Sequence, residues 1–301
     1  MKQLLIHFIF LVILSPALAE DRIDICDRGI IGAAIAKAVS EASCKDVSVQ
    51  KMRELESLVI VNQNISSLPE GVFAGLDSLK SLILESNQLK HIEQNAFQGL
   101  SQLKVLRLDH NHLKSISPRV FAELRLLEVL DISFNRLQKI SDQGFLGLIS
   151  LSELRANQNQ LSETPNLSGL SSLRSLDLEG NSIAEIRRLS DLPRLASVKL
   201  SHNEIQQIAV AAFQEVPALV FLDLRFNQIQ KVQPWFLRAE NLKTISLDNN
   251  NISVIERDAF LELPRLEELS FYENPISEVC RNHVGLKVSV HVGGATQKDC
   301  P

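Results

Sequence analysis

The sequence predicts an α/β repeat solenoid, curved like a horseshoe, with a parallel concave sheet of about ten rungs and disulfide-bonded caps. Three observations predict this fold. An eleven-residue pattern, LxxLxLxxNxL, recurs along most of the chain, and Leu103 to Leu113 is one copy of it. Successive copies start 22 to 24 residues apart, a period typical of solenoids. The four cysteines lie outside the repeats, two at each end.

Ten copies of the pattern start at Leu55, Leu79, Leu103, Leu127, Leu151, Leu173, Leu195, Leu219, Leu242 and Leu266. We call each copy, with the residues up to the next start, a rung, and we number its positions from the starting leucine. Asn occupies position nine in nine rungs, and Gln63 takes its place in the first. Residues 55–276 are therefore predicted to form the repeat region.

The spacing within a rung predicts how the rungs pack. Each LxxLxL segment is expected to form a short strand whose leucines point inward, and because one rung cannot bury them alone, neighbours must stack. The position-nine Asn turns the chain, and its amide is expected to satisfy backbone groups of adjacent turns. Phenylalanines near position nineteen are predicted to fill the convex side of the core: Phe73, Phe97, Phe121, Phe145, Phe213, Phe236 and Phe260. Rungs five and six are shorter and lack this Phe, so a local change of curvature is expected between Leu161 and Leu195.

The first residues, 1–19, have the features of a secretory signal. Lys2 precedes an apolar run, and Ala17 to Ala19 offers a cleavage site of small residues. The run is too short to span a bilayer comfortably, and no later stretch has the pattern of a transmembrane helix. We therefore expect no membrane span and a secreted or periplasmic protein whose mature chain begins near Glu20.

An open solenoid exposes leucines at each end unless a cap covers them. Residues 20–54 are predicted to form a helical N-terminal cap, with a helix from Arg28 to Ala42. The apolar stripe of this helix is expected to be Ile30, Ile31, Ala34, Ile35 and Val39. Residues 277–301 are predicted to form the C-terminal cap, in which Val284 to Val292 alternates like a strand.

Four cysteines allow three pairings, and a signal for export favours disulfides over free thiols. Ten strands at about 4.8 Å each place the two ends roughly 45 Å apart, which no disulfide can bridge. The predicted disulfides are therefore Cys26–Cys44 and Cys280–Cys300.

The repeats resemble the leucine-rich-repeat superfamily across residues 55–276. Cys26-Asp27-Arg28, the helix of small residues, Cys44 and the segment Val47 to Leu58 resemble the N-terminal cap of secreted bacterial members, and the 22-residue rungs resemble internalin-type repeats. Animal extracellular members usually carry four-cysteine caps, a pattern absent here, so the resemblance implies a bacterial origin. It also implies recognition of a partner protein, without identifying that partner.

Positions two, three, five, seven and eight should line the concave face. Position five alternates in charge from rung three to rung eight: Arg107, Asp131, Arg155, Asp177, Lys199 and Asp223. Opposite charges on neighbouring strands contribute about 0.2–1 kcal/mol per pair. This alternation favours a ladder that satisfies itself, and the functional alternative is a polar template for a charged partner.

Two groups of residues are candidates for contact with the partner. The first, which we call the C-terminal patch, consists of Val220, Phe221, Arg225, Phe226 and Tyr272. Aromatic and arginine side chains are common binding anchors. The structural alternative is that Phe134 and Phe226, both at position eight, lean on the neighbouring rung. The second group, the N-terminal polar group, consists of Glu85, Asp109 and His110.

Catalysis, metal binding and cofactor binding are not expected. Glu85 and Asp109 occupy position seven of adjacent rungs, near glycosidase spacing of roughly 5 Å, but an open face without a pocket should leave two solvated acids. His110 and His202 share a column four rungs apart, about 19 Å, too far to share a metal ion. The sequence contains no GxSxG, no HExxH and no phosphate-binding glycine loop.

The sequence thus predicts an exported module that binds a partner protein through its concave face. The alternative is a structural or self-associating envelope protein without a dedicated ligand. A formal net charge of -5 disfavours nucleic acid as a partner. Asn64, Asn166 and Asn251 each begin an N-x-S triplet, which is a glycosylation signal in a eukaryote and a set of turn residues in a bacterium.

Overall fold

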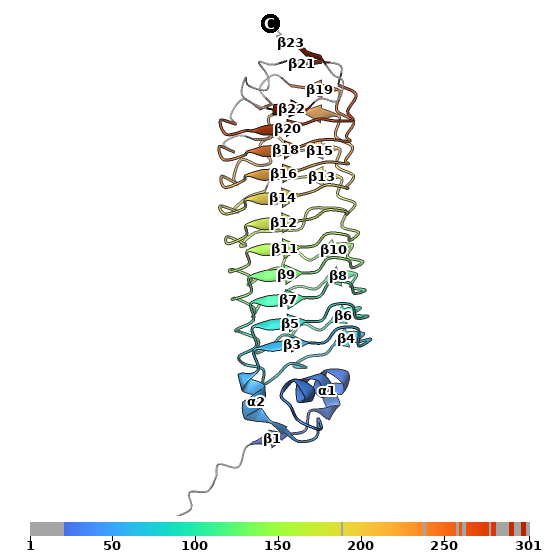
Figure 1. Ribbon diagram of the computed structural model, residues 1–301, viewed down its shortest axis with the longest axis vertical. Coiled ribbons are helices and arrows are strands. Elements are labelled where there is room, and N and C mark those ends of the chain that lie inside the picture. Colours follow the sequence, from blue (N-terminus) through green and yellow to red (C-terminus); the bar gives the residue numbers. More distant parts are fainter. Residues whose placement is uncertain are drawn as a thin grey trace, which may run out of the picture.

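The rungs stack along one axis, with the N-terminal cap at one end (Figure 1). The computed structural model describes residues 21–187, 189–236, 239–256, 259–260, 263–276, 278–280, 289–291 and 296–298. Within these residues no helix has the length and apolarity needed to cross a membrane. The predicted signal, residues 1–19, lies outside them.

One parallel sheet of eleven strands runs the length of the molecule. Its strands are β3 (Ser57–Val59), β5 (Ser81–Ile83), β7 (Val105–Arg107), β9 (Val129–Asp131), β11 (Glu153–Arg155), β12 (Ser175–Asp177), β14 (Ser197–Lys199), β16 (Phe221–Asp223), β18 (Thr244–Ser246), β20 (Glu268–Ser270) and β22 (Ser289–His291). The first ten strands cover positions three to five of the ten predicted rungs, which confirms the fold class. The eleventh comes from residues assigned to the C-terminal cap on sequence grounds.

The core is a stack of equivalent side chains. Position four pairs with position four of the next strand, as in Leu106 with Leu130, and both side chains are fully buried. The seven predicted phenylalanines are also buried, and four pairs of them on adjacent rungs stack, as Phe97 does on Phe121 with ring centroids 5.8 Å apart. The expectations for both the inward leucines and the convex phenylalanines are confirmed.

The position-nine asparagines form a continuous hydrogen-bonded ladder. Asn135 is typical: its Nδ2 donates to the carbonyl oxygens of Leu108, Ile132 and Ser133, and its Oδ1 accepts from the backbone N–H of Leu113 at 3.0 Å. The other eight asparagines make the equivalent bonds between rungs. Each amide therefore satisfies backbone groups of a buried bend, as the sequence predicts.

Short strands follow the asparagine turn on the convex side. They are β4 (Ser67–Leu68), β6 (His91–Ile92), β8 (Ser115–Ile116), β10 (Lys139–Ile140), β13 (Glu185–Ile186), β15 (Gln207–Ile208), β17 (Lys231–Val232) and β19 (Val254–Ile255). Rung five, although fully described, has none. A cavity of about 340 Å³, lined in part by Ile140, Leu167 and Leu189, opens at this point. The short rungs therefore alter the convex side, and the expected change of curvature stays a prediction.

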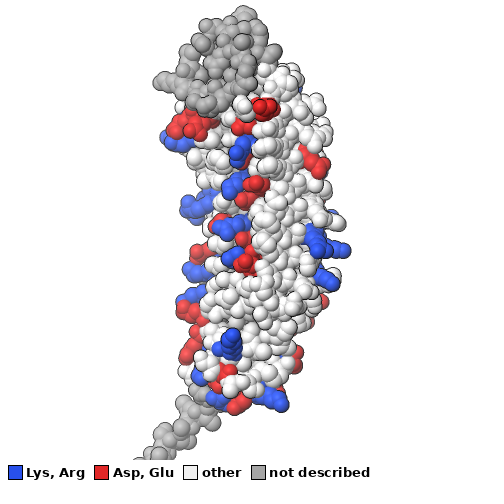
Figure 2. All heavy atoms as spheres, turned by 45° about the vertical axis from the view of Figure 1, so that its right-hand side comes forward, with Lys and Arg blue, Asp and Glu red and all other residues white. Residues whose placement is uncertain are grey.

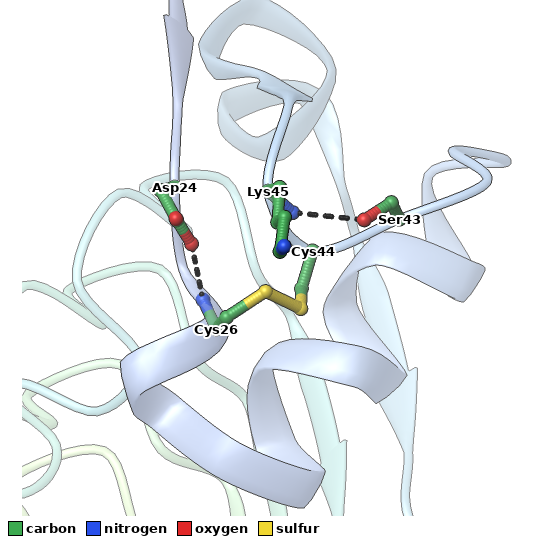
Figure 3. Close-up of a disulfide and its surroundings, with 5 residues drawn as sticks. All are labelled: Asp24, Cys26, Ser43, Cys44 and Lys45. Atoms are coloured by element: carbon green, nitrogen blue, oxygen red, sulfur yellow. Dashed lines mark hydrogen bonds between the residues drawn. A yellow bond between two sulfur atoms is a disulfide. The ribbon is translucent and has the colours of Figure 1, made fainter.

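The N-terminal cap consists of β1 (Arg22–Ile23), the 3-10 helix η1 (Cys26–Arg28), α1 (Gly29–Ala38), β2 (Val47–Ser48) and α2 (Val49–Glu54). The predicted disulfide between Cys26 and Cys44 is present, with a Cα–Cα distance of 5.0 Å (Figure 3). The backbone N–H of Ile25 donates to the carbonyl of Cys44 beside it. The disulfide thus ties the start of the helical segment to the turn that precedes β2.

Two details of the predicted cap helix are wrong. The α-helix ends at Ala38 rather than Ala42, because Ser40 adopts a left-handed backbone conformation with φ 61°. Ile30 is 49% exposed, whereas Ile31 and Ile35 are buried. Residues four apart share a helix face, and Ile30 lies about 100° around the axis from Ile31. The buried stripe therefore leaves Ile30 facing solvent.

At the other end, β21 (Glu278–Cys280) pairs in parallel with β23 (Thr296–Lys298). The predicted Cys280–Cys300 disulfide lies outside the described residues.

Candidate functional site: the concave sheet

The N-terminal polar group is brought together at positions seven and eight of rungs two and three. Possible ligand atoms of Glu85, Asp109 and His110 lie within 4.8 Å of one another. Arg107 lies between the two acids: its Nη2 is 2.9 Å from Glu85 Oε2 and 3.1 Å from Asp109 Oδ2. The Nδ1 atom of His110 is 3.1 Å from the same Asp109 oxygen. A guanidinium group therefore supplies the positive charge at this cluster.

The expectation of two solvated acids is wrong for Asp109, which is only 3% exposed. Both of its carboxylate oxygens accept hydrogen bonds from Arg107. These bonds raise the pKa of Arg107 above its ordinary value. The charges of Asp109 and Glu85 also raise this pKa, whereas desolvation by burial lowers it. An acid bound in this way is held in place as part of the sheet surface.

Charged side chains gather in columns along the long axis of the molecule (Figure 2). In the position-five column, Asp131 pairs with Arg155 at 3.4 Å and Asp177 pairs with Lys199 at 3.2 Å. Asp223, by contrast, pairs with Arg225 of its own rung. The expected ladder therefore forms as separate pairs in the described part of the sheet. Arg107 is held by Glu85 and Asp109 at position seven, and Arg155 also pairs with Glu153 at position three.

Four residues of the C-terminal patch lie on a single rung. Val220 and Phe221 are half-buried at positions two and three of rung eight, while Arg225 and Phe226 are exposed at positions seven and eight. Tyr272 is 53% exposed but belongs to rung ten. Rung nine therefore separates Tyr272 from the rest of the predicted group.

The exposed phenylalanines stack on histidines of the preceding rung. Phe226 lies on His202 with ring centroids 4.3 Å apart, and Phe134 lies on His110 at 4.4 Å. The structural alternative, in which these rings lean on the neighbouring rung, is therefore confirmed. Each ring nevertheless keeps an exposed part, 43% for Phe226 and 46% for Phe134.

Position eight imposes an unusual backbone conformation. All ten residues there have positive φ: Asn62, Ser86, His110, Phe134, Gln158, Gly180, His202, Phe226, Asn249 and Glu273. Gly and Asn adopt this conformation readily, whereas a bulky residue such as Phe does so at a cost of about 1–2 kcal/mol. In each of the two stacked His–Phe pairs, the Phe thus occupies a position whose backbone conformation is unfavourable for it.

Arg225 is held in a fixed orientation by Asp223. Its Nε and Nη2 donate to the two carboxylate oxygens at 2.9 and 2.7 Å. These hydrogen bonds raise the pKa of Arg225, against a smaller opposing effect of desolvation, and the charges of Asp248 and Glu179 add to the rise. The guanidinium is therefore anchored on one side and 46% exposed.

Two serines at position seven show a difference that sequence analysis missed. Ser133 is buried, and its hydroxyl donates to Asp131 Oδ1 at 2.5 Å. Ser201 is equally buried, but its Oγ has no hydrogen-bond partner. The cause is position five of the same rung, which is Asp131 in one case and Lys199 in the other. Comparing positions five and seven across the rungs would have revealed it.

This difference predicts opposite responses to alanine. Ser133→Ala should lower the free energy of unfolding by about 1–2 kcal/mol, because the buried Asp131 loses a donor. Ser201→Ala should leave the free energy unchanged or raise it, because a buried hydroxyl without a partner is removed. Urea denaturation followed by circular dichroism measures both values. Equal losses in the two variants would contradict the assignment.

The stacked strands, the asparagine ladder and the open polar face define a leucine-rich-repeat solenoid. The model of the leucine rich repeat family matches residues 53–113, 101–161, 125–183, 171–229 and 222–276, so the chain belongs to this family. Such proteins are typically recognition modules without enzymatic activity. A curated relative, P-granule-associated novel protein 1 of Caenorhabditis elegans, is 36% identical over an alignment of 83 residues, and the match covers 24% of this chain and 14% of the relative.

Solved structures show the same fold. TLR13 in complex with ssRNA13 is 26% identical with a TM-score of 0.72, and the match covers 77% of this chain and 35% of TLR13. The octameric complex of Latrophilin 3, Unc5D and FLRT2, with FLRT2 as the leucine-rich-repeat component, gives 29% identity, a TM-score of 0.60 and coverages of 65% and 62%. An internalin from Listeria monocytogenes gives 19% identity, a TM-score of 0.64 and coverages of 93% and 87%. The chain thus spans about a third of TLR13 and most of the internalin.

Proposed function

We propose that this chain is an exported bacterial module that binds a partner protein through the C-terminal patch of its concave face. The support for export is the signal-like segment 1–19 together with a disulfide-bonded cap, since disulfides persist in oxidising compartments. The support for a bacterial source is the two-cysteine cap, which resembles those of secreted bacterial members. The mature protein would then act in the periplasm or outside the cell.

One observation carries the choice of surface. Among the ten rungs, rung eight alone has apolar side chains at positions two, three and eight: Val220, Phe221 and Phe226. These side chains are all partly exposed, beside the anchored guanidinium of Arg225. Aromatic and arginine side chains are typical of binding hot spots.

Two other classes of function have less support. Nucleic acid would require a basic surface to neutralise phosphates, whereas the concave face carries more acids than bases. Catalysis would require a pocket that desolvates reactive groups, and the one close pair of acids, Glu85 and Asp109, is neutralised by Arg107. We therefore favour binding over either alternative.

The proposal is tested by replacing the patch. The variant Phe221→Ala/Arg225→Ala/Phe226→Ala/Tyr272→Ala should lose the partner that the immobilised mature protein captures from envelope or host extracts. Loss of two or more hot-spot residues typically weakens binding by a factor of 100 or more, on the order of 3 kcal/mol. Mass spectrometry identifies the partner, and surface plasmon resonance with the purified partner measures the change in Kd.

Phe134→Ala is the matched control, because Phe134 has the same stacking, backbone conformation and exposure as Phe226 but lies four rungs away. The control should bind the partner as the wild type does. Full binding by the quadruple variant, with its circular dichroism unchanged, would exclude the C-terminal patch as the interface.

A further inference from the structure

We propose that the partner presents a cationic, arginine- or lysine-rich surface to rungs six to ten of the concave face. This inference rests on the proposed function and adds the chemistry of the partner to it. Three features of these rungs carry it. They are an excess of negative charge, exposed aromatic rings beside that charge, and a buried serine hydroxyl that has no hydrogen-bond partner.

The first feature is an excess of carboxylates. At positions five, seven and eight, rungs six to ten contain five acidic and two basic side chains: Asp177, Glu179, Asp223, Asp248, Glu273, Lys199 and Arg225. Both bases are already engaged, Lys199 with Asp177 and Arg225 with Asp223. The remaining acids of this set therefore have no cation of their own.

We call the acids of this region that make no ion pair with a described residue the acidic border: Glu179, Asp248, Glu268 and Glu273. The charge of Arg225, which is bonded to Asp223, also acts on Glu179 and Asp248. No basic side chain among the described residues makes an ion pair with any of them. Asp248 accepts hydrogen bonds from Ser270 Oγ and from the backbone N–H of Tyr272, but these donors are neutral. The acidic border therefore keeps its negative charge, which attracts a positively charged partner.

The second feature is the position of the exposed rings. Phe226 lies at position eight of rung eight and Tyr272 at position seven of rung ten, and Asp248, at position seven of rung nine, lies on the rung between them. Aromatic faces attract arginine and lysine side chains, most strongly where carboxylates lie close by. A surface that combines exposed rings with unpaired acids matches cations better than it matches neutral or anionic groups.

The third feature is independent of charge. Ser201 occupies position seven of rung seven, between Glu179 of rung six and Arg225 of rung eight. It is 2% exposed, and its hydroxyl has no hydrogen-bond partner. Native proteins satisfy nearly all buried polar groups, so an exception marks a place where a partner group is missing. Ser201 lies in the position-seven column, which also contains Glu179 and Asp248 of the acidic border.

The experiment uses two labelled probe peptides of equal length, one alternating alanine with arginine and the other alanine with glutamate. Fluorescence anisotropy with the full mature protein should show binding of the arginine peptide, with an affinity that falls as sodium chloride rises. The glutamate peptide should not bind. Equal binding of both peptides, or binding of neither, would overturn the proposal.

Two charge-matched variants locate the binding. Glu179→Gln/Glu268→Gln/Glu273→Gln removes most of the acidic border and spares Asp248, which bonds the backbone. It should weaken binding of the arginine peptide about tenfold, since each lost interaction is a surface one. The control Glu93→Gln/Glu163→Gln/Glu185→Gln makes the same change of net charge on the convex side. The control should bind the arginine peptide as the wild type does. If both variants bind the peptide equally weakly, the peptide is attracted by the net charge of the protein alone, and the proposed site is wrong.

A further variant, Phe226→Leu/Tyr272→Leu, removes the aromatic faces and keeps apolar side chains. It should also weaken binding of the arginine peptide. Failure of this inference is distinguishable from failure of the proposed function. If the natural partner binds through the C-terminal patch, but at a salt-independent affinity and without competition from the arginine peptide, the interface stands and its cationic chemistry is wrong.

Discussion

Asn135→Ala should lower the free energy of unfolding by about 3 kcal/mol. The side chain is buried and makes four hydrogen bonds, three donated by Nδ2 and one accepted by Oδ1, and those to Leu108 and Leu113 join it to the preceding rung. Alanine leaves the buried N–H of Leu113 without an acceptor, and a buried donor of this kind costs about 1–3 kcal/mol. The carbonyls of Leu108 and Ile132 lose a donor at the same time. Urea denaturation followed by far-UV circular dichroism measures the change.

The first rung provides the matched control. Gln63 occupies position nine, but it is exposed, and its Nε2 donates only to Val61 and Asn62 of its own rung. Gln63→Ala should therefore change the free energy of unfolding by less than about 0.5 kcal/mol. A small effect at Asn135, or equal effects at the two positions, would show that the ladder does not stabilise the stack.

The repeat pattern predicts the architecture well because each repeated residue has one task in every rung. A leucine that must be buried and an asparagine that must satisfy a bend recur at fixed spacing, so their roles follow from periodicity alone. The cysteine pairing at the N-terminal cap is predicted for a similar reason, since the length of the solenoid excludes the alternatives. These features depend on position in the repeat and not on neighbouring side chains.

The candidate site is harder to predict because its properties depend on differences between rungs. Asp109 appears as a solvated acid until Arg107 is seen to cover it. Ser133 and Ser201 occupy the same position, yet only one finds an acceptor. Similarly, Tyr272 appears to belong with Phe226 on sequence grounds, although an intervening rung separates them. Side-chain pairing within a rung decides the first two cases, and the repeat period does not encode it.

The N-terminal cap contributes a stabilisation that depends on one covalent bond. Cys26→Ser/Cys44→Ser should lower the stability of the cap by about 3 kcal/mol, the value expected when a loop of this length loses its cross-link. The disulfide spans 18 residues and encloses α1, whose Ile31 and Ile35 are buried against the first rungs. Without the bond, the unfolded cap has more conformational entropy, whereas the contacts of the folded cap stay the same. The folded cap is therefore less stable.

Because rungs contact only their neighbours, this loss should begin at the N-terminal end. Hydrogen exchange should show α1 and α2 opening at lower urea than β14 or β16, and the fluorescence of Trp235, the single tryptophan of the chain, should report the later unfolding of rung eight. Substitution is a better test than a reductant, since a reductant would act on every disulfide in the chain. The cap and rung eight of the variant could instead unfold together, at the same urea concentration as in the wild type. That result would mean that packing alone holds the cap on the stack.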